Sequence, residues 1–321
     1  MLPYRRLTIV PVLLATMVSA SAGEWPERPV KIVYPYAAGS TGDATARLLA
    51  RRLGEKLGQP FIVENRVGAN GVIGTEAVAH AAPDGHTLLW AITPQIAISP
   101  VMTKVSYNPV TDFVPISAVS LNTFALVVNA KVPAKTVTEF IAYFRAQPHG
   151  FTYAEGGAGS ISHLAMVLFL NRVGIKGTNV SYKGIVPALT DVVAGHLPAT
   201  FALLGDALSQ SDGSAIRILA VSSGERSAIA PSVPSIAESG FPGFNAVSWW
   251  GLMGPAQMPR RIVDGISLEV AQAIKDPKIA EQLTRFGIDP VGNTPAQFSA
   301  MISADIKLWS EAIRLAGFQQ N

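Results

Sequence analysis

The chain has 321 residues, five histidines, no cysteine and a formal net charge of +3 at neutral pH. The lack of cysteine excludes disulfides, thiolate metal or redox sites and a lipid-anchored amino-terminal cysteine. No stripe of Lys and Arg runs through the sequence, which argues against binding to nucleic acid or to a membrane surface. The histidines show no metal-ligand spacing, so neither a metal nor a cofactor is expected.

The first 22 residues have the pattern of a secretory signal peptide. A basic start, Arg5-Arg6, precedes a mostly apolar stretch over 7–18, and Ala20-Ser21-Ala22 gives an A-x-A cleavage site. Pro11 interrupts the apolar stretch, which is also shorter than the roughly 20 residues that span a bilayer. We therefore expect residues 1–22 to be removed and a soluble mature protein, with its net charge reduced from +3 to +1 by the loss of the two arginines, to reside in the periplasm.

Short apolar runs alternate with segments of helical period along the rest of the chain. The predicted strands cover 30–34, 61–63, 87–90, 124–128, 151–154, 179–181, 201–204 and 216–221. The alternation predicts an α/β fold, and strands that are apolar throughout are typical of parallel strands covered by helices on both faces. The roughly 300 mature residues favour two domains.

A glycine-rich turn follows the first predicted strand. Gly39-Ser40-Thr41-Gly42 leads into a helix whose N-cap we expect to be Ser40 or Thr41, with the glycines letting a ligand approach the backbone. The free amides of a first helical turn attract an anion. The nucleotide motifs are absent, and Asp43 would repel a dianion, so a carboxylate is favoured over a phosphate. An ordinary capped strand-to-helix turn is the alternative interpretation.

Two further turns repeat this pattern in the second half of the chain. Gly156-Gly157-Ala158-Gly159-Ser160 precedes a helix that Ser160 is expected to cap, and Tyr182-Lys183-Gly184 precedes a helix over 187–193. In α/β sheets, ligands bind outside the carboxyl ends of the strands, where all three turns lie. A ligand that contacts all of them would occupy a cleft between two domains, with chain crossings near 121–123 and 245–248.

The sequence resembles the Bug family, the extracytoplasmic solute receptors of tripartite tricarboxylate transporters. The stretches that carry the resemblance are 25–31 with 34–36, 63–66, 68–71 with 74, 82–88, 107–109 with 112–113, 159–164, 182–184, 231–243, 248–249 and 290–292. The resemblance spans nearly the whole mature chain. It implies a type II periplasmic binding protein fold, with 23–123 and 247–321 as a discontinuous domain I and 124–246 as domain II.

The resemblance also implies a binding mode. A small carboxylic acid is held mainly by backbone amides and bridging waters when the two domains close around it. The residues carried over by position are Tyr36, Ala38, Gly39, Ser40, Thr41 and Asp43 from the first loop, and Gly157, Ser160, His163 and Tyr182 from the second half. The implied partners are the ligand and two integral-membrane transporter subunits, the receptor itself being a monomer without catalytic residues.

Two positions depart from the family pattern. The first loop of the family usually has a second glycine where this chain has Ser40, which adds a hydroxyl to a bare backbone. Many members place Asp-Asn after the phenylalanine that aligns with Phe201, whereas Ala202-Leu203 follow here. The second departure predicts a ligand with a less polar body than citrate.

Alternative interpretations remain for individual residues and for the function. Trp249, at a predicted crossing, is a candidate for the cleft wall, although large aromatic side chains are also common in cores. His163 beside Ser160 suggests a hydrolase, but the sequence around them lacks the G-x-S-x-G nucleophile elbow. A capping serine and a packed histidine explain both residues without catalysis. A receptor that reports its ligand to a signalling partner is the other alternative.

Overall fold

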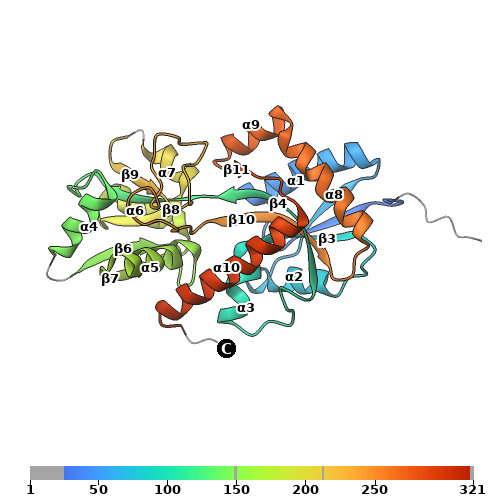
Figure 1. Cartoon of the computed structure of the whole chain (residues 1–321), viewed down its shortest axis with the longest axis horizontal. Coiled ribbons are helices and arrows are strands. Elements are labelled where there is room, and N and C mark those ends of the chain that lie inside the picture. The colour runs from blue at the N-terminus through green and yellow to red at the C-terminus, as the bar shows by residue number, and fades with distance from the viewer. Residues whose placement is uncertain (1–24, 148–149, 212, 319–321) are drawn as a thin grey trace, which may run out of the picture.

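The computed structural model describes residues 25–147, 150–211 and 213–318. Two mixed β-sheets lie side by side, and each is covered by helices on both faces (Figure 1). This architecture confirms the predicted α/β class. The predicted signal peptide, 1–22, lies outside the described residues. No helix in the described ranges is both long enough and apolar enough to cross a membrane.

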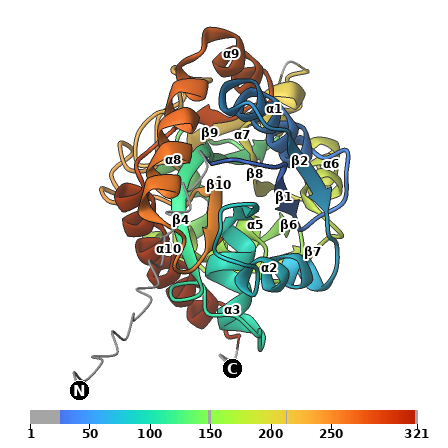
Figure 2. The same ribbon diagram turned by 90° about the vertical axis from the view of Figure 1, so that its right-hand side faces the viewer.

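The first lobe is built on a six-stranded sheet with the order β11-β4-β10-β3-β1-β2. The strands are β1 (Val30–Tyr34), β2 (Phe61–Asn65), β3 (Thr87–Ile92), β4 (Phe113–Asn122), β10 (Ser248–Pro255) and β11 (Asp289–Pro290). One face packs against α1 (Thr41–Leu57), α8 (Arg260–Lys275) and α9 (Pro277–Arg285). The other packs against α2 (Val72–Ala79), and Figure 2 shows α2 and α8 on different sides of the strands.

The second lobe is built on a five-stranded sheet with the order β7-β6-β8-β5-β9. The strands are β5 (Phe124–Asn129), β6 (Phe151–Glu155), β7 (Gly177–Ser181), β8 (Ala199–Leu203) and β9 (Ile216–Val221). The core on one face includes side chains of α4 (Val137–Arg145) and α5 (Ile161–Val173). The core on the other face includes α6 (Ile185–Ala194) and α7 (Leu204–Ser211).

The strand directions correct part of the sequence interpretation. β1 pairs in parallel with β2 and β3, and β6 with β7 and β8, as expected. β10 is antiparallel to both β3 and β4, and β5 is antiparallel to both β8 and β9. β4 and β10 were not predicted as strands, because serines and glycines such as Ser117, Ser120 and Gly251 interrupt their apolar pattern.

The two lobes are joined by strands that run between them. β4 is followed directly by Thr123 and β5, so the chain passes from one sheet to the other within one extended segment (Figure 1). The return crossing enters β10, whose first residue Ser248 pairs with Asn122 at the end of β4. The crossings therefore lie side by side, within the two segments in which the sequence predicted them.

The last helix, α10 (Pro295–Leu315), contacts both lobes. Phe298 and Ile302, near its start, belong to a core of the first lobe, whereas Trp309 and Ile313, near its end, belong to a core of the second. The predicted division assigned all of 247–321 to domain I. The helix instead provides a third physical connection between the lobes.

Candidate functional site

A cavity of about 820 Å³ lies between the lobes and is lined by both of them. We call it the cleft. The first lobe contributes Tyr36, parts of the short turns η1 (Ala69–Gly71) and η2 (Pro94–Ile98), and the segment from Ser99 to Lys104 that includes α3 (Ser99–Met102). The second lobe contributes 156–161 and 182–184. These segments follow β1, β2, β3, β6 and β7, so the cleft lies at carboxyl ends of strands, as predicted.

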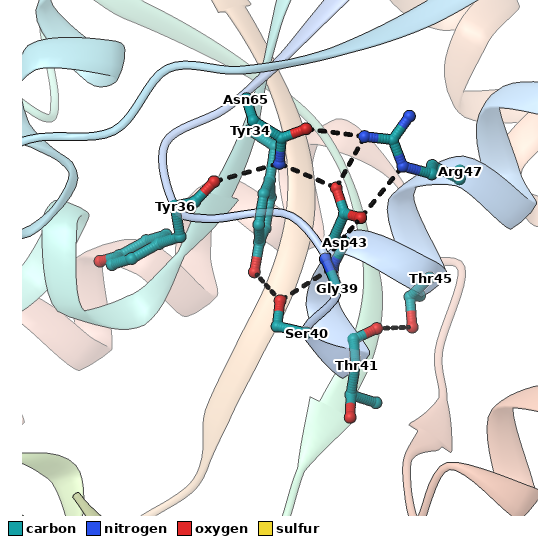
Figure 3. Close-up of polar contacts among 9 residues, drawn as sticks. All are labelled: Tyr34, Tyr36, Gly39, Ser40, Thr41, Asp43, Thr45, Arg47 and Asn65. Atoms are coloured by element: carbon teal, nitrogen blue, oxygen red, sulfur yellow. Dashed lines mark hydrogen bonds and ion pairs between the residues drawn. The ribbon is translucent and has the colours of Figure 1, made fainter.

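Ser40 caps the helix that follows the first loop, which confirms one of the two predicted caps. Its hydroxyl accepts a hydrogen bond from the Asp43 amide at 3.2 Å and lies 2.8 Å from the Tyr34 hydroxyl (Figure 3). Gly39 adopts a positive φ of 89°, as a tight turn requires. A Cβ on Gly42 would lie 2.6 Å from the Tyr34 hydroxyl. Gly42 therefore makes room for Tyr34 and not for a ligand, contrary to the sequence interpretation.

Asp43 is buried, and its carboxylate is fully engaged within the first loop. Arg47 donates to both of its oxygens, at 3.0 and 3.1 Å, while the amide of Gly39 and the side-chain amide of Asn65 donate at 3.1 and 2.9 Å (Figure 3). Burial alone would raise the pKa of Asp43, but these hydrogen bonds and the charge of Arg47 outweigh it and lower the pKa. The ion pair also offsets the repulsion of an anion that the sequence attributed to Asp43.

Asn65 connects this network to the cleft-lining residue Tyr36. Its side chain donates to the carbonyl oxygen of Tyr36 at 3.1 Å, and the Tyr36 hydroxyl donates to the carbonyl oxygen of Asn70 at 3.0 Å. The Tyr36 ring lies against Gly71, where a Cβ would approach it to 3.1 Å. The network therefore fixes both the backbone and the ring of Tyr36. Ala38, Gly39, Ser40 and Thr41 are exposed beside it but do not line the cleft in this conformation.

The second loop, Gly156 to Ser160, is held by hydrogen bonds to polar groups beneath it. Ser160 caps α5, as predicted, by accepting from the His163 amide at 3.3 Å. The amide of Gly156 donates to the Ser162 hydroxyl at 2.9 Å, and the amide of Gly159 donates to Nδ1 of His163 at 3.1 Å. The loop is thus held by side chains from the first turn of the helix that it precedes.

Glu155, the last residue of β6, is fully buried below this loop. Its carboxylate accepts from the amide of Gly157 and, at 3.2 Å, from the side chain of Asn179. Gly157 therefore lines the cleft with an amide that is already paired. Within the described chain, the amides of Ile161 and Ser162, in the first turn of α5, have no protein acceptor, and Ile161 lines the cleft. They are therefore among the backbone donors that are free to bind an anion.

His163 is 5% exposed and has a structural environment. Burial lowers its pKa, with the charge of Glu155 opposing the shift, and its ring meets Phe318 edge-on at 5.7 Å. The Ser160 hydroxyl contacts the backbone amide of His163 and the Ser162 hydroxyl at 2.9 Å, and not the imidazole. No Ser-His dyad is formed here, so the geometry gives no support to the hydrolase interpretation.

Tyr182, from the third loop, also lines the cleft. Its hydroxyl donates to the carboxylate of Asp191 on α6, and this hydrogen bond, with burial, raises the pKa of Tyr182 to about 12. The helix is capped by Gly195, whose φ of 82° is left-handed. The tether fixes the direction of the Tyr182 ring relative to α6.

Three residues singled out in the sequence lie in cores or pack against them instead. Trp249 has no exposed surface, its indole donates to Asp305 at 2.6 Å, and its ring packs edge-on against Phe298 at 4.9 Å. It therefore has no surface with which to contact a ligand in the cleft. Ala202 is equally buried, and Leu203 packs against the core on the other face of the sheet. Neither side chain lines the cleft, so they do not support the prediction about ligand polarity.

The family is decided by a comparison with known proteins. Residues 45–318 match the sequence model of the tripartite tricarboxylate transporter family receptor. The chain belongs to this family. The receptor is 34% identical to Protein BugT of Bordetella pertussis over 318 residues, which cover 98% of each chain. The resemblance to Bug receptors is thereby confirmed, and with it the type II binding-protein fold and the function of a periplasmic solute-binding receptor.

Two solved structures show how the receptor compares with relatives in different states. A Rhodopseudomonas palustris protein, Rpa4515 with adipate, is 32% identical, with a TM-score of 0.75 over 92% of this chain and 99% of its own. A solute-binding protein from Polaromonas with no ligand is only 26% identical, yet its TM-score is 0.83 over 91% of this chain and 99% of its own. The receptor is more similar in shape to the ligand-free relative.

Sequence reasoning missed several residues of the site. Asn65 was not among the predicted site residues, but it holds Tyr36 and Asp43. Glu155 gave no signal, because it ends an apolar strand as an isolated acidic residue. Lys104 was not considered either, since it follows η2 and α3, which carry no glycine-rich turn.

Proposed function

We propose that the receptor binds a small organic carboxylate in the cleft, closes around it and delivers it to the two membrane subunits of a tripartite transporter. The observation that carries this proposal is the second loop, which brings the unpaired amides at the start of α5 to a cavity shared by both lobes. The adipate in the relative from Rhodopseudomonas palustris supports a carboxylate as the anion.

The chemistry of the cleft also favours an anion with an apolar body. Among the described residues that line it, none is Asp or Glu. Ile92, Pro94 and Ile98 supply apolar surface from the first lobe. Ala202 and Leu203 do not support the prediction of a ligand that is less polar than citrate. The apolar lining of the cleft supports it instead.

Closure of the lobes is supported by the connections between them. The crossings at β4 and β10 are short and adjacent, so a small rotation there opens or closes the cleft. The TM-score is higher with the relative that has no ligand, and we propose that this structure is likewise a form that has not closed around a ligand. On closure, we propose that the first loop, from Ala38 to Thr41, approaches the carboxylate bound at Ser160.

We also propose that the receptor delivers its ligand from the periplasm to the membrane subunits. Delivery requires removal of the signal peptide, 1–22, and a monomer that presents its loaded form to the membrane subunits. We propose no catalytic step. If deletion of the genes for the membrane subunits left uptake of the ligand unchanged, delivery would be contradicted and a sensing role favoured.

A thermal-shift screen of carboxylic acids tests the binding function. A ligand present at roughly 100 times its Kd adds about 2.7 kcal/mol of stability, which raises Tm by several degrees. We expect Ser160→Ala to weaken binding by roughly 0.5 to 1.5 kcal/mol, the scale of one hydrogen bond. Thr136→Ala, which removes the cap of α4 outside the cleft, is the matched control. No shift with any carboxylate would contradict the function, and citrate as the strongest ligand would contradict the apolar body.

A further inference from the structure

We propose that a contact between the lobes, on the side of the crossings that faces away from the cleft, holds the receptor open and has to break when the lobes close. We call this contact the latch. It consists of Ser227 and Gly205 in the second lobe against Asp289 and Gly287 in the first. The inference rests on the proposed closure of the lobes. It adds which residues set the balance between the open and the closed form.

The polar part of the latch is centred on the carboxylate of Asp289. The Ser227 hydroxyl donates to this carboxylate and lies 2.8 Å from both of its oxygens. The hydroxyl of Thr123, between β4 and β5, donates to the same carboxylate at 3.0 Å. Ser227 is buried, and Ala230 beyond it packs into a core of the second lobe. A hydrogen bond to a charged group, shielded from water, therefore joins the two lobes.

The other part of the latch is a contact between two backbones. Gly205 is the second residue of α7, and Gly287 lies between α9 and β11. A Cβ added to Gly205 would lie 3.0 Å from Cα of Gly287, and a Cβ added to Gly287 would lie 2.5 Å from Cα of Gly205. Neither contact could be relieved by rotating a side chain. The lobes therefore touch so closely here that a single added methyl group would push them apart.

The latch and the cleft lie on opposite sides of the crossings. In the first sheet, β11 lies beyond β4, whereas β3, β1 and β2 lie on the side of β10. In the second sheet, β9 lies beyond β5, whereas β6 and β7 lie on the side of β8. The cleft-lining segments follow β1, β2, β3, β6 and β7, but Asp289 is in β11 and Ser227 follows β9. Figure 1 shows the same division, with α7, β9, α9 and β11 above the crossing strands and α3, α5 and β6 below them.

This arrangement couples the latch to closure. A rotation at the crossings that brings the cleft-lining segments together moves the segments on the other side apart. The hydrogen bond of Ser227 and the contact of Gly205 are then present in the open form and lost in the closed form. An interaction made in only one of two states shifts the equilibrium toward that state. The latch therefore keeps the empty receptor open and lowers its apparent affinity for the ligand that closes it.

Two variants weaken the latch in different ways. Ser227→Ala removes the donor to Asp289, and Gly205→Ala separates the backbones with a residue that favours the helix α7. Pulsed EPR measures the distance between spin labels at Ile73→Cys in α2 and Val186→Cys in α6, two exposed positions in a chain without other cysteines. Without ligand, each variant should raise the closed, short-distance population about two- to fivefold, and the double variant about tenfold.

The control variants are Ser239→Ala and Gly265→Ala. Ser239 donates within its own segment, to the carbonyl oxygen of Ser235, and a Cβ on Gly265 in α8 would have no atom within 4 Å. Both controls should keep the wild-type distances. A larger closed population in the two latch variants, but not in the controls, supports the latch whether or not a ligand is present.

Adipate is the probe that separates the latch from closure itself. If adipate shortened the distance in wild type, but both latch variants kept the ligand-free distances of wild type, the latch would be overturned and the proposed function would stand. Long distances in every protein, with and without adipate, would overturn the latch and the proposed closure together.

Discussion

The first and second loops have the same local sequence pattern but are stabilised by different contacts. Each is glycine-rich, follows a parallel strand and ends in a serine that caps a helix, Ser40 in one lobe and Ser160 in the other. The first is braced from the side by the ion pair of Asp43 with the half-exposed Arg47. The second is anchored from below by Glu155, which has no exposed surface. Similar sequence motifs therefore need not respond alike to mutation, salt or pH.

The largest expected difference concerns these two carboxylates. Glu155→Ala empties a fully buried position and leaves the partly buried amide of Gly157 without an acceptor, whereas the exposed side chain of Asn179 can be hydrated. We therefore expect the free energy of unfolding to fall by roughly 2 to 3 kcal/mol. Asp43→Ala leaves Arg47 free to be hydrated and should cost only about 1 to 2 kcal/mol. Urea denaturation of both variants measures the difference.

The control for this comparison is Glu225→Ala, because Glu225 is exposed. We expect it to change the free energy of unfolding by less than about 0.5 kcal/mol. An equal loss of the free energy of unfolding in Glu155→Ala and Asp43→Ala would contradict this distinction between the second and the first loop.

A smaller difference is expected in the pH dependence of stability. Burial lowers the pKa of His163 below its ordinary value of 6.5, so the unfolded chain binds a proton there at a higher pH than the folded chain does. The stability due to neutral His163 is therefore present above pH 6.5 and is lost as the pH falls through the folded pKa. The corresponding loss at Asp43 begins only below its ordinary pKa of 3.8, because its pKa is also lowered.

Denaturation midpoints measured between about pH 7 and pH 5 test this order. The wild type should lose stability with a slope of at most about 1.4 kcal/mol per pH unit. His163→Gln, which keeps an acceptor for Gly159, should show a flatter profile, whereas Asp43→Asn should keep the wild-type slope. A wild-type slope in His163→Gln would show that the second loop does not titrate through this residue.

The comparison also separates what the sequence could predict from what it could not. The caps at Ser40 and Ser160 were predictable, because capping depends on residues three positions apart. The role of Asn65 depends on the parallel register of β1 and β2, which places Asn65 opposite Tyr34. Neither this register nor the burial of Glu155 is encoded in a local pattern.

Long-range packing also explains the predictions that the structure did not support. Trp249 is the second residue of β10, which lies between β3 and β4, and its ring packs against Phe298 of α10 instead of lining the cleft. Ala202 lies in the middle of a pairing with Ala125 of β5, which buries it in the second lobe. Alignment with a family motif therefore predicts where the backbone runs. It does not predict where the side chain points when the residue differs from the family's.

The central claim is that the anion is held by the unpaired amides at the start of α5. Amide NMR of the mature protein, titrated with its preferred carboxylate, tests this claim most directly. We predict that the Ile161 and Ser162 amide resonances shift downfield and exchange more slowly with solvent, while those of Gly157 and Gly159, which already have acceptors, change less. Ligand binding that leaves Ile161 and Ser162 unshifted would contradict the account.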